Sequence, residues 1–155
     1  MLLGYLVAMN STEMPVAKGL IPHREPFLFI DEIVEMEPGH RVVANWNITG
    51  DEVTQGFFKG HFPGRPTLPG VLMVEALAQA GACGILSVDE YKDKLPLFGG
   101  VDKVKFRRQV SPGETLKLEV EITKLGSRAG RGTGKAHVGD ELACVAELLF
   151  VLVPA

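Results

Sequence analysis

The feature that most constrains this chain is an almost continuous apolar run that begins at Pro69 and ends at Leu86. Proline is favoured at a helix start because the backbone N–H that it lacks has no partner there, so the run predicts a helix. Its apolar side chains cover every side of that helix: Leu72, Val74, Ala76, Leu77, Ala78, Ala80 and Ala82. Such a helix is buried in a core or in a membrane. The polar residues Glu75 and Gln79 oppose a membrane span, so we expect a helix buried within a protein.

Glu75 and Gln79 are four residues apart, which places them on one face of the helix. Burying a carboxylate costs several kcal/mol unless it is paired, hydrogen-bonded or neutralised, so we expect Glu75 to have a specific structural or functional role. His61 lies upstream, in a loop rich in glycine and proline that leads into the helix. A histidine and a buried carboxylate near one helix start indicate acid–base chemistry. Each residue alone also has a plainer interpretation, Glu75 as a structural carboxylate and His61 as an ordinary loop histidine.

Length and charge limit the class of protein. The 155 residues suffice for one domain with one core, and the net charge of −3 argues against a nucleic-acid binder. Cys83 and Cys144 lie in apolar segments and imply no disulfide framework. The apolar start of the chain is short and lacks a basic segment, so we do not interpret it as a signal peptide. We expect a single cytoplasmic domain over residues 1–155, with residues 1–11 as an N-terminal extension and no membrane partner.

The rest of the chain predicts strands. Alternating or apolar segments, separated by Pro-Gly, Gly-Ser and Gly-Asp turns, fall at residues 27–36, 41–49, 101–110, 115–124, 128–138 and 141–153. Short turns join antiparallel neighbours. A further short helix is expected over residues 12–18. The pattern predicts an α+β fold of about six strands, with a curled antiparallel sheet wrapped around one long buried helix and a second subunit supplying the remaining cover.

Three stretches resemble the 3-hydroxyacyl-acyl-carrier-protein dehydratases of the FabZ type. They are residues 20–31 (LIPHREPFLFID), 60–79 (GHFPGRPTLPGVLMVEALAQ) and 100–108 (GVDKVKFRR). The resemblance implies the hotdog fold and a dimeric catalytic unit, commonly assembled as a trimer of dimers. It also implies removal of water from a (3R)-hydroxyacyl thioester to give the trans-2-enoyl thioester, with His61 and Glu75 as catalytic residues contributed by opposite subunits. A glutamate rather than an aspartate at position 75 favours the simple dehydratase over the sister dehydratase–isomerase group.

The expected chemistry assigns a task to each residue. Neutral imidazole works as a base near pH 7, so His61 takes the C2 proton, and Glu75 protonates the leaving hydroxyl. We expect the N–H of Gly70, and that of Val71, to stabilise charge on the thioester oxygen at the helix start. Gln79 is expected to orient Glu75 or a water molecule. The candidate lining of the acyl tunnel consists of Phe57, Phe58, Phe62 and Leu72, together with residues along 101–106.

Acyl carrier protein is strongly acidic, and the densest basic cluster is a candidate docking site: Lys103, Lys105, Arg107 and Arg108. The alternative is a merely solvated strand face. Glu25 stands where the family usually has an aromatic residue associated with gating the tunnel. It is expected to pair with Arg24 or to repel the carrier.

Two other functions stay open at this point, a hotdog acyl thioesterase and a non-catalytic acyl-carrier-binding subunit. Thioesterases usually activate water with a carboxylate on the helix and need no histidine at the position of His61. An inactive subunit does not need both His61 and Glu75. No cofactor or metal is indicated, because the remaining histidines are dispersed without ligand spacing: His23, His40 and His137.

Overall fold

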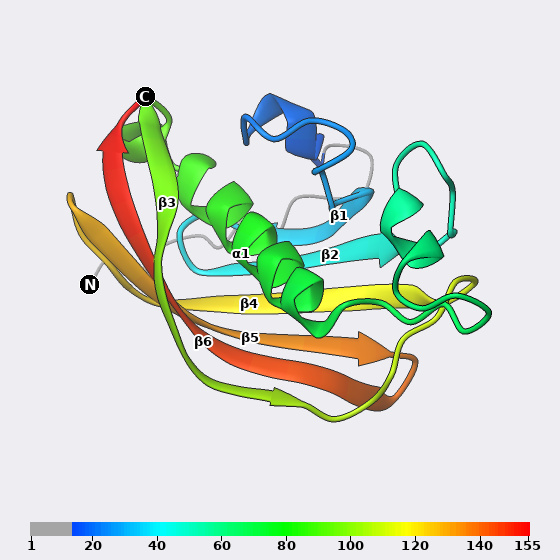
Figure 1. Cartoon of the computed structure of the whole chain (residues 1–155). Helices are drawn as coiled ribbons and strands as arrows, with labels where there is room; N and C mark the ends of the chain where they lie inside the picture. The colour runs from blue at the N-terminus through cyan, green and yellow to red at the C-terminus, as the bar shows by residue number, and fades with distance from the viewer. Residues whose placement is uncertain (1–13) are drawn as a thin grey trace.

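The computed structural model describes residues 14–155, and one long helix lies across the concave face of a curled sheet (Figure 1). The helix, α1, spans Gly70–Leu86. The six-stranded sheet has the order β1-β2-β4-β5-β6-β3, and every neighbouring pair is antiparallel. The strands are β1 (Glu32–Glu37), β2 (Arg41–Asn47), β3 (Lys94–Phe106), β4 (Thr115–Leu125), β5 (Ala129–Val138) and β6 (Glu141–Pro154). This confirms the predicted hotdog arrangement. Single 3₁₀ turns lie at Ala17–Gly19 (η1), Gly56–Lys59 (η2) and Asp89–Tyr91 (η3).

The predicted start of the first strand is wrong, because β1 begins at Glu32 rather than at Phe27. The side chain of Gln79 on α1 makes hydrogen bonds with this segment in place of a neighbouring strand. Its Oε1 accepts from the N–H of Phe29 at 2.8 Å, and its Nε2 donates to the carbonyl of Phe27 at 3.0 Å. Residues 27–30 are therefore held against the helix instead of extending the sheet.

The predicted bounds of the third strand are wrong at both ends, because β3 spans Lys94–Phe106 rather than residues 101–110, and it includes Pro96. Proline is tolerated there because β3 is an edge strand that, within residues 14–155 of one chain, pairs only with β6. The predicted helix over residues 12–18 is also wrong within the described residues, where only η1 forms. Residues 12 and 13 lie outside the described part of the chain.

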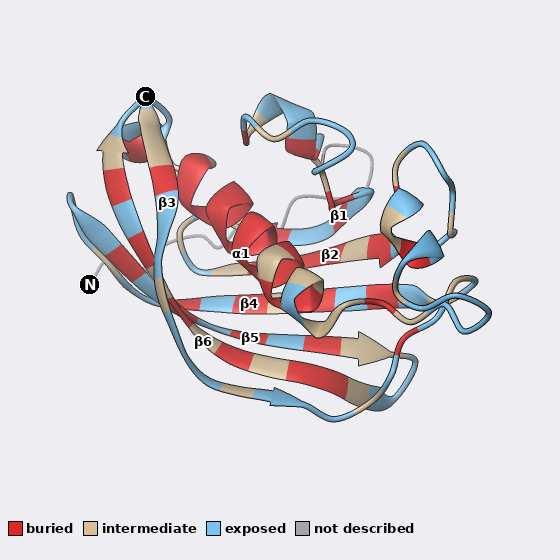
Figure 2. Cartoon of the chain, in the orientation of Figure 1, coloured by how far each residue is buried: buried red, intermediate tan, exposed pale blue. Residues whose placement is uncertain are grey.

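Most of α1 is buried, as Figure 2 shows by its colour. Small residues let the sheet approach the helix closely. A Cβ on Gly84 would lie only 2.6 Å from Cγ2 of Val42 on β2, so a larger residue there would push the strand away. The buried helix predicted from the apolar run is thus confirmed over most of its length. Within residues 14–155, no helix is both long and apolar enough to cross a bilayer.

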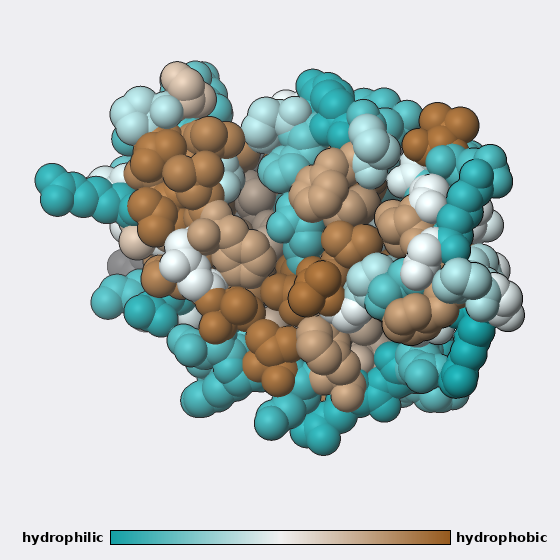
Figure 3. All heavy atoms as spheres, viewed as in Figure 1, coloured by the Kyte–Doolittle hydropathy of each residue, from teal (hydrophilic) through white to brown (hydrophobic). Residues whose placement is uncertain are grey.

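One end of α1 and the edge strand β3 are left uncovered by the chain itself. Val71 in the first helical turn is 69% exposed, and several apolar side chains of β3 are also exposed: Leu97, Phe98, Val101 and Phe106. Figure 3 shows apolar side chains gathered on this face of the molecule. A long edge strand with free backbone groups and apolar side chains is a template for pairing with another chain.

Candidate active site

His61 is fixed by the loop that carries it. Its ring Nδ1 lies 2.6 Å from the carbonyl oxygen of Thr67. A carbonyl only accepts, so Nδ1 carries the hydrogen and Nε2 of the neutral ring is left as an acceptor. The N–H of Thr67 in turn donates to the carbonyl of His61 at 2.9 Å, and the ring of Phe62 stacks on the imidazole. The peptide bond between His61 and Phe62 is cis. The loop therefore presents a basic nitrogen in a defined orientation.

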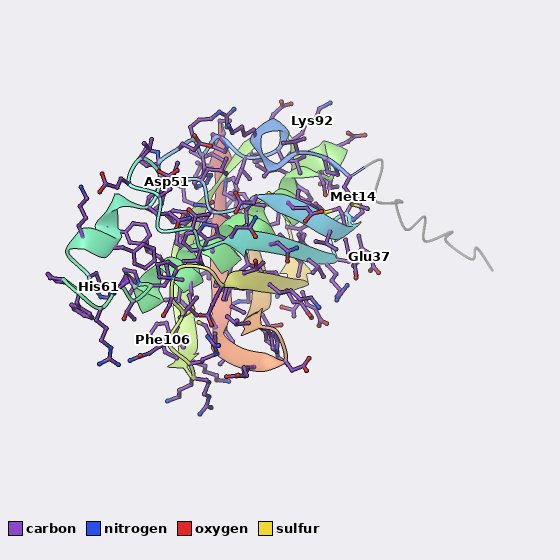
Figure 4. The ribbon with its side chains drawn as sticks, turned by 90° about the vertical axis from the view of Figure 1, so that its right-hand side faces the viewer. Met14, Glu37, Asp51, His61, Lys92 and Phe106 are labelled. Atoms are coloured by element: carbon purple, nitrogen blue, oxygen red, sulfur yellow. The ribbon has the colours of Figure 1, made fainter. Side chains whose placement is uncertain are left out.

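His61 faces a cavity of about 550 Å³ at the start of α1. The lining combines the helix start with the end of β3 and the loop that follows it: Thr67, Leu68, Pro69, Gly70, Val71, Met73, Phe106, Arg107, Arg108 and Gln109. Figure 4 shows His61 and Phe106 at the same end of the molecule, away from Glu37 and Lys92. The first N–H groups of a helix have no partner within it. Among the described residues the amides of Gly70 and Val71 have no backbone acceptor, so they are free to bind an anionic oxygen in this cavity.

Position 70 requires glycine because the ring of Phe106 lies close to its backbone. A Cβ at this position would lie 2.9 Å from Cε1 of Phe106, closer than real contacts allow. Any side chain would therefore displace the Phe106 ring, which forms one wall of the cavity. The absence of a side chain keeps the amides at the helix start accessible.

Glu75 lies one turn further along α1, with its side chain 21% exposed rather than fully buried as expected from the apolar run. Its Oε1 accepts a hydrogen bond of 3.0 Å from Nε2 of Gln79. Gln79 is only 1% exposed, and its two bonds to residues 27 and 29 fix which end of the amide is the donor. Gln79 and Glu75 are therefore in contact, as expected from their spacing on the helix.

His23 is the residue near this carboxylate that sequence reasoning missed. Its Nε2 lies 3.7 Å from Oε1 of Glu75, and the two residues line the same small cavity of about 50 Å³. The signal was available, because His23 lies within the stretch 20–31 that carries the family resemblance. The distance along the chain hid the contact, since only the tertiary fold brings the two residues together.

Within residues 14–155, His61 and Glu75 line two different cavities. The cavity around Glu75 is lined by residues of α1, the edge strand β3 and their neighbours: His23, Ala78, Gln79, Ala82, Pro96, Phe98 and Phe150. None of these lines the cavity of His61. The two candidate catalytic groups therefore form two half-sites, one at each end of β3.

The predicted tunnel residues lie in three different places. Phe57 and Leu72 line a third cavity of about 470 Å³ together with Phe27 and Phe29. Phe58 is only 7% exposed and belongs to the hydrophobic core, so it offers little surface to a ligand. Phe62 is exposed and stacks on His61.

The basic cluster divides into two paired and two free cations. Lys103 lies 3.2 Å from Glu147. Arg108 binds Glu114 through two hydrogen bonds and also contacts Glu141. The hydrogen bonds from Arg108 lower the pKa of Glu114, although partial burial opposes the shift. Lys105 and Arg107 are exposed and have no carboxylate partner within residues 14–155.

Two further expectations concern the partner of Glu25 and the presence of a metal site. Glu25 pairs with Lys18 at 3.7 Å, whereas Arg24 binds backbone carbonyls, so the expected pairing of Glu25 with Arg24 is wrong. In the described part of the chain, no group of three or more His, Cys, Asp or Glu side chains is arranged to hold a metal ion.

Solved structures support the fold. The structure matches the dehydratase heterocomplex ApeI:P from Xenorhabdus doucetiae with a TM-score of 0.78 over 91% of this chain and 93% of that chain, at 18% sequence identity. It also matches an uncharacterized protein from Pyrococcus horikoshii with a TM-score of 0.61 at 12% identity, over 81% of this chain and 85% of that chain. Identities this low show the fold alone.

Sequence comparisons define the class and then the family. Residues 21–147 match the model of the FabA-like domain. The 3-hydroxyacyl-[acyl-carrier-protein] dehydratase FabZ of Moorella thermoacetica is 53% identical over 135 residues, which are 87% of this chain and 92% of the relative. The dehydratase of the same name from Alkaliphilus metalliredigens is 54% identical over 134 residues, 86% of this chain and 89% of the relative. The chain belongs to the FabZ family of 3-hydroxyacyl-[acyl-carrier-protein] dehydratases.

Proposed function

We propose that this protein removes water from (3R)-hydroxyacyl-acyl carrier protein and forms trans-2-enoyl-acyl carrier protein, in fatty acid synthesis in the cytoplasm. The observation that carries the proposal is the contact of 2.6 Å between Nδ1 of His61 and the carbonyl oxygen of Thr67. The carbonyl of Thr67 holds the hydrogen on Nδ1 and leaves Nε2 free to accept a proton. Family membership supplies the substrate class.

The proposed reaction balances through two residues. Nε2 of His61 takes the proton from C2, and the electron pair of that C–H bond forms the double bond between C2 and C3. The C3–O bond breaks, and the carboxyl of Glu75 gives its proton to the departing hydroxyl, which leaves as water. Transfer of a proton from the imidazolium back to the Glu75 carboxylate restores the starting state.

The amides of Gly70 and Val71 are proposed to stabilise the enolate-like charge on the thioester oxygen. They lie in the first turn of α1, where the helix dipole adds positive potential, and they line the cavity that His61 faces. The close contact between Gly70 and Phe106 keeps this position free of a side chain.

We propose that the complete site forms between two copies of the chain. We also propose that three such dimers assemble into a trimer of dimers. β3 borders both half-sites, through Phe106 at the cavity of His61 and through Phe98 at that of Glu75. If two copies pair antiparallel along β3 about a twofold axis, the Phe106 end of one lies beside the Phe98 end of the other. This would bring His61 of one copy toward Glu75 of the second.

A mixing experiment tests the shared site. We expect His61→Ala and Glu75→Gln each to retain only a small, measurable residual activity alone. Co-refolding the two variants should restore about a quarter of the wild-type activity, because half of the dimers are hybrids and each hybrid has one intact site. No recovery, with hybrid dimers demonstrated by tagged subunits, would place both residues of a site in one subunit.

The acidic carrier is proposed to dock on the free cations Lys105 and Arg107, beside the cavity of His61. Reversing these charges should raise the KM for carrier-bound substrate more than the KM for a small thioester. Because Lys103 and Arg108 are already paired with glutamates, their reversal should discriminate less between the two substrates. Equal effects on both substrates would contradict docking at this surface.

The decisive test is the ultraviolet absorbance of the enoyl thioester. The purified protein is incubated with a short 3-hydroxyacyl or enoyl thioester of the carrier, beside His61→Ala. Reversible interconversion that is lost in the variant is expected. Release of free thiol would instead indicate a thioesterase, and binding without turnover would indicate a non-catalytic carrier-binding subunit.

A further inference from the structure

Within residues 14–155, polar side chains approach only one of the two carboxyl oxygens of Glu75. Nε2 of Gln79 donates to Oε1 at 3.0 Å, and Nε2 of His23 lies 3.7 Å from the same Oε1. Among residues 14–155, Oε2 has no hydrogen-bond partner. The two oxygens of this carboxyl group are therefore in different environments.

Gln79 cannot reverse its role, because its own amide is fixed. Its Oε1 accepts from the backbone N–H of Phe29, and its Nε2 donates to the backbone carbonyl of Phe27. Turning the amide over would set a donor against the N–H and an acceptor against the carbonyl, inside a region that is almost fully buried. Gln79 is thus a permanent donor toward Glu75, and Oε1 must be an acceptor.

His23 has a preferred tautomer for a related reason. Its Nδ1 is buried and has no partner, so a hydrogen on that atom would be left unsatisfied. The favoured neutral tautomer carries its hydrogen on Nε2, the nitrogen that faces Oε1 of Glu75. The separation of 3.7 Å is slightly beyond hydrogen-bond distance, and a small shift of either side chain closes it. Arg24 braces this loop by donating to the carbonyls of Ile21 and Lys18.

We propose that His23 is a positioning residue that acts with Gln79 to keep Oε1 of Glu75 as an acceptor, so that Oε2 is the oxygen that carries the catalytic proton. A carboxylic acid has one O–H, and two donors aimed at one oxygen force the hydrogen onto the other. The inference rests on the proposed role of Glu75 as the acid and adds which atom performs it and which residue secures it.

A matched pair of variants isolates the N–H of His23. His23→Gln and His23→Met have flexible side chains that each extend to an ε atom, but only glutamine offers an N–H. We expect His23→Met to lower kcat about tenfold while the KM for the carrier-bound substrate changes less than about twofold. His23→Gln should recover most of the lost kcat. Circular dichroism and the oligomeric mass of both variants verify that they fold.

A double-mutant cycle with Glu75→Gln separates positioning from a merely structural role. If His23 acts through Glu75, His23→Met should cause no further loss of kcat when Glu75 is already glutamine. An equal loss in both backgrounds, with Glu75→Gln itself impaired, would overturn this inference alone. Equal kcat for His23→Met and His23→Gln would also overturn it. Full activity of Glu75→Gln would overturn the acid assignment and this inference together.

Discussion

The two half-sites differ in the sequence separation between the catalytic residue and the residues that hold it in place. His61 is held by Thr67, six residues away, within one short loop. Glu75 is held by Gln79, which is itself fixed by the backbone around residue 28, about fifty residues earlier, and it lies beside His23. The base depends on local structure, whereas the acid depends on the tertiary fold. Substitution of His61 should therefore affect chemistry with little effect on stability, whereas substitution of the residue that holds Glu75 should affect both together.

The largest expected effect is the loss of the base. His61→Ala should lower kcat/KM by about 10²–10⁴-fold, the range that a general base contributes. The free energy of unfolding should change little, because the ring is only partly buried and its one ring hydrogen bond lies within its own loop. Parallel activity and urea-unfolding measurements check both statements. A large loss of stability would contradict the local character of this half-site.

The acid half-site should respond differently to the loss of Gln79. Gln79→Met leaves the N–H of Phe29 and the carbonyl of Phe27 without partners, so we expect a loss of about 2–4 kcal/mol in the free energy of unfolding, together with reduced kcat. Chemical denaturation gives the first quantity and steady-state kinetics the second.

Gln55 offers a matched control for that prediction. It is the other buried glutamine of the described residues, and it makes three backbone hydrogen bonds, with Asn47, Thr49 and Gly50. Gln55→Met should destabilise by a similar amount while the kcat of the folded fraction stays near the wild-type value. Equal losses of kcat in the two variants would show that Gln79 matters only for folding.

The contrast between local and long-range contacts also explains which features the sequence could predict. The apolar run from Pro69 to Leu86 determines a buried helix, and the alternation of the strands with their short turns determines an antiparallel sheet. The expected chemistry of His61 and Glu75 follows from residue type and local spacing. The contact of His23 with Glu75 and the irregular path of residues 27–30 could not be predicted, because both depend on contacts between segments about fifty residues apart.

A smaller effect is expected where the two half-sites share the edge strand. Gly70→Ala places a Cβ 2.9 Å from the ring of Phe106, and relieving such overpacking costs about 1–3 kcal/mol. The activity should fall as well, since the ring forms a wall of the cavity of His61. Combining Gly70→Ala with Phe106→Leu should recover part of the stability, which thermal unfolding measures. Strictly additive losses would show that the strain arises elsewhere.

The smallest expected effect concerns the ion pair that anchors Arg108 beside the cavity of His61. Two hydrogen bonds from Arg108 lower the pKa of Glu114 below its ordinary value of 4.5. A group whose pKa is lowered by folding adds stability above its unfolded pKa and loses that contribution as the pH falls through the folded pKa. Glu114→Gln should therefore reduce the free energy of unfolding by less than about 1 kcal/mol near pH 7. The difference from wild type should shrink as the pH falls below 4.5.

Urea unfolding of wild type and variant at a series of pH values measures this difference, and Glu121→Gln is the control. Glu121 is exposed on β4 and forms no ion pair with the described residues, so its substitution should have little effect at any pH. A cost of Glu114→Gln that stays constant from neutral to acidic pH would show that packing rather than charge holds Arg108.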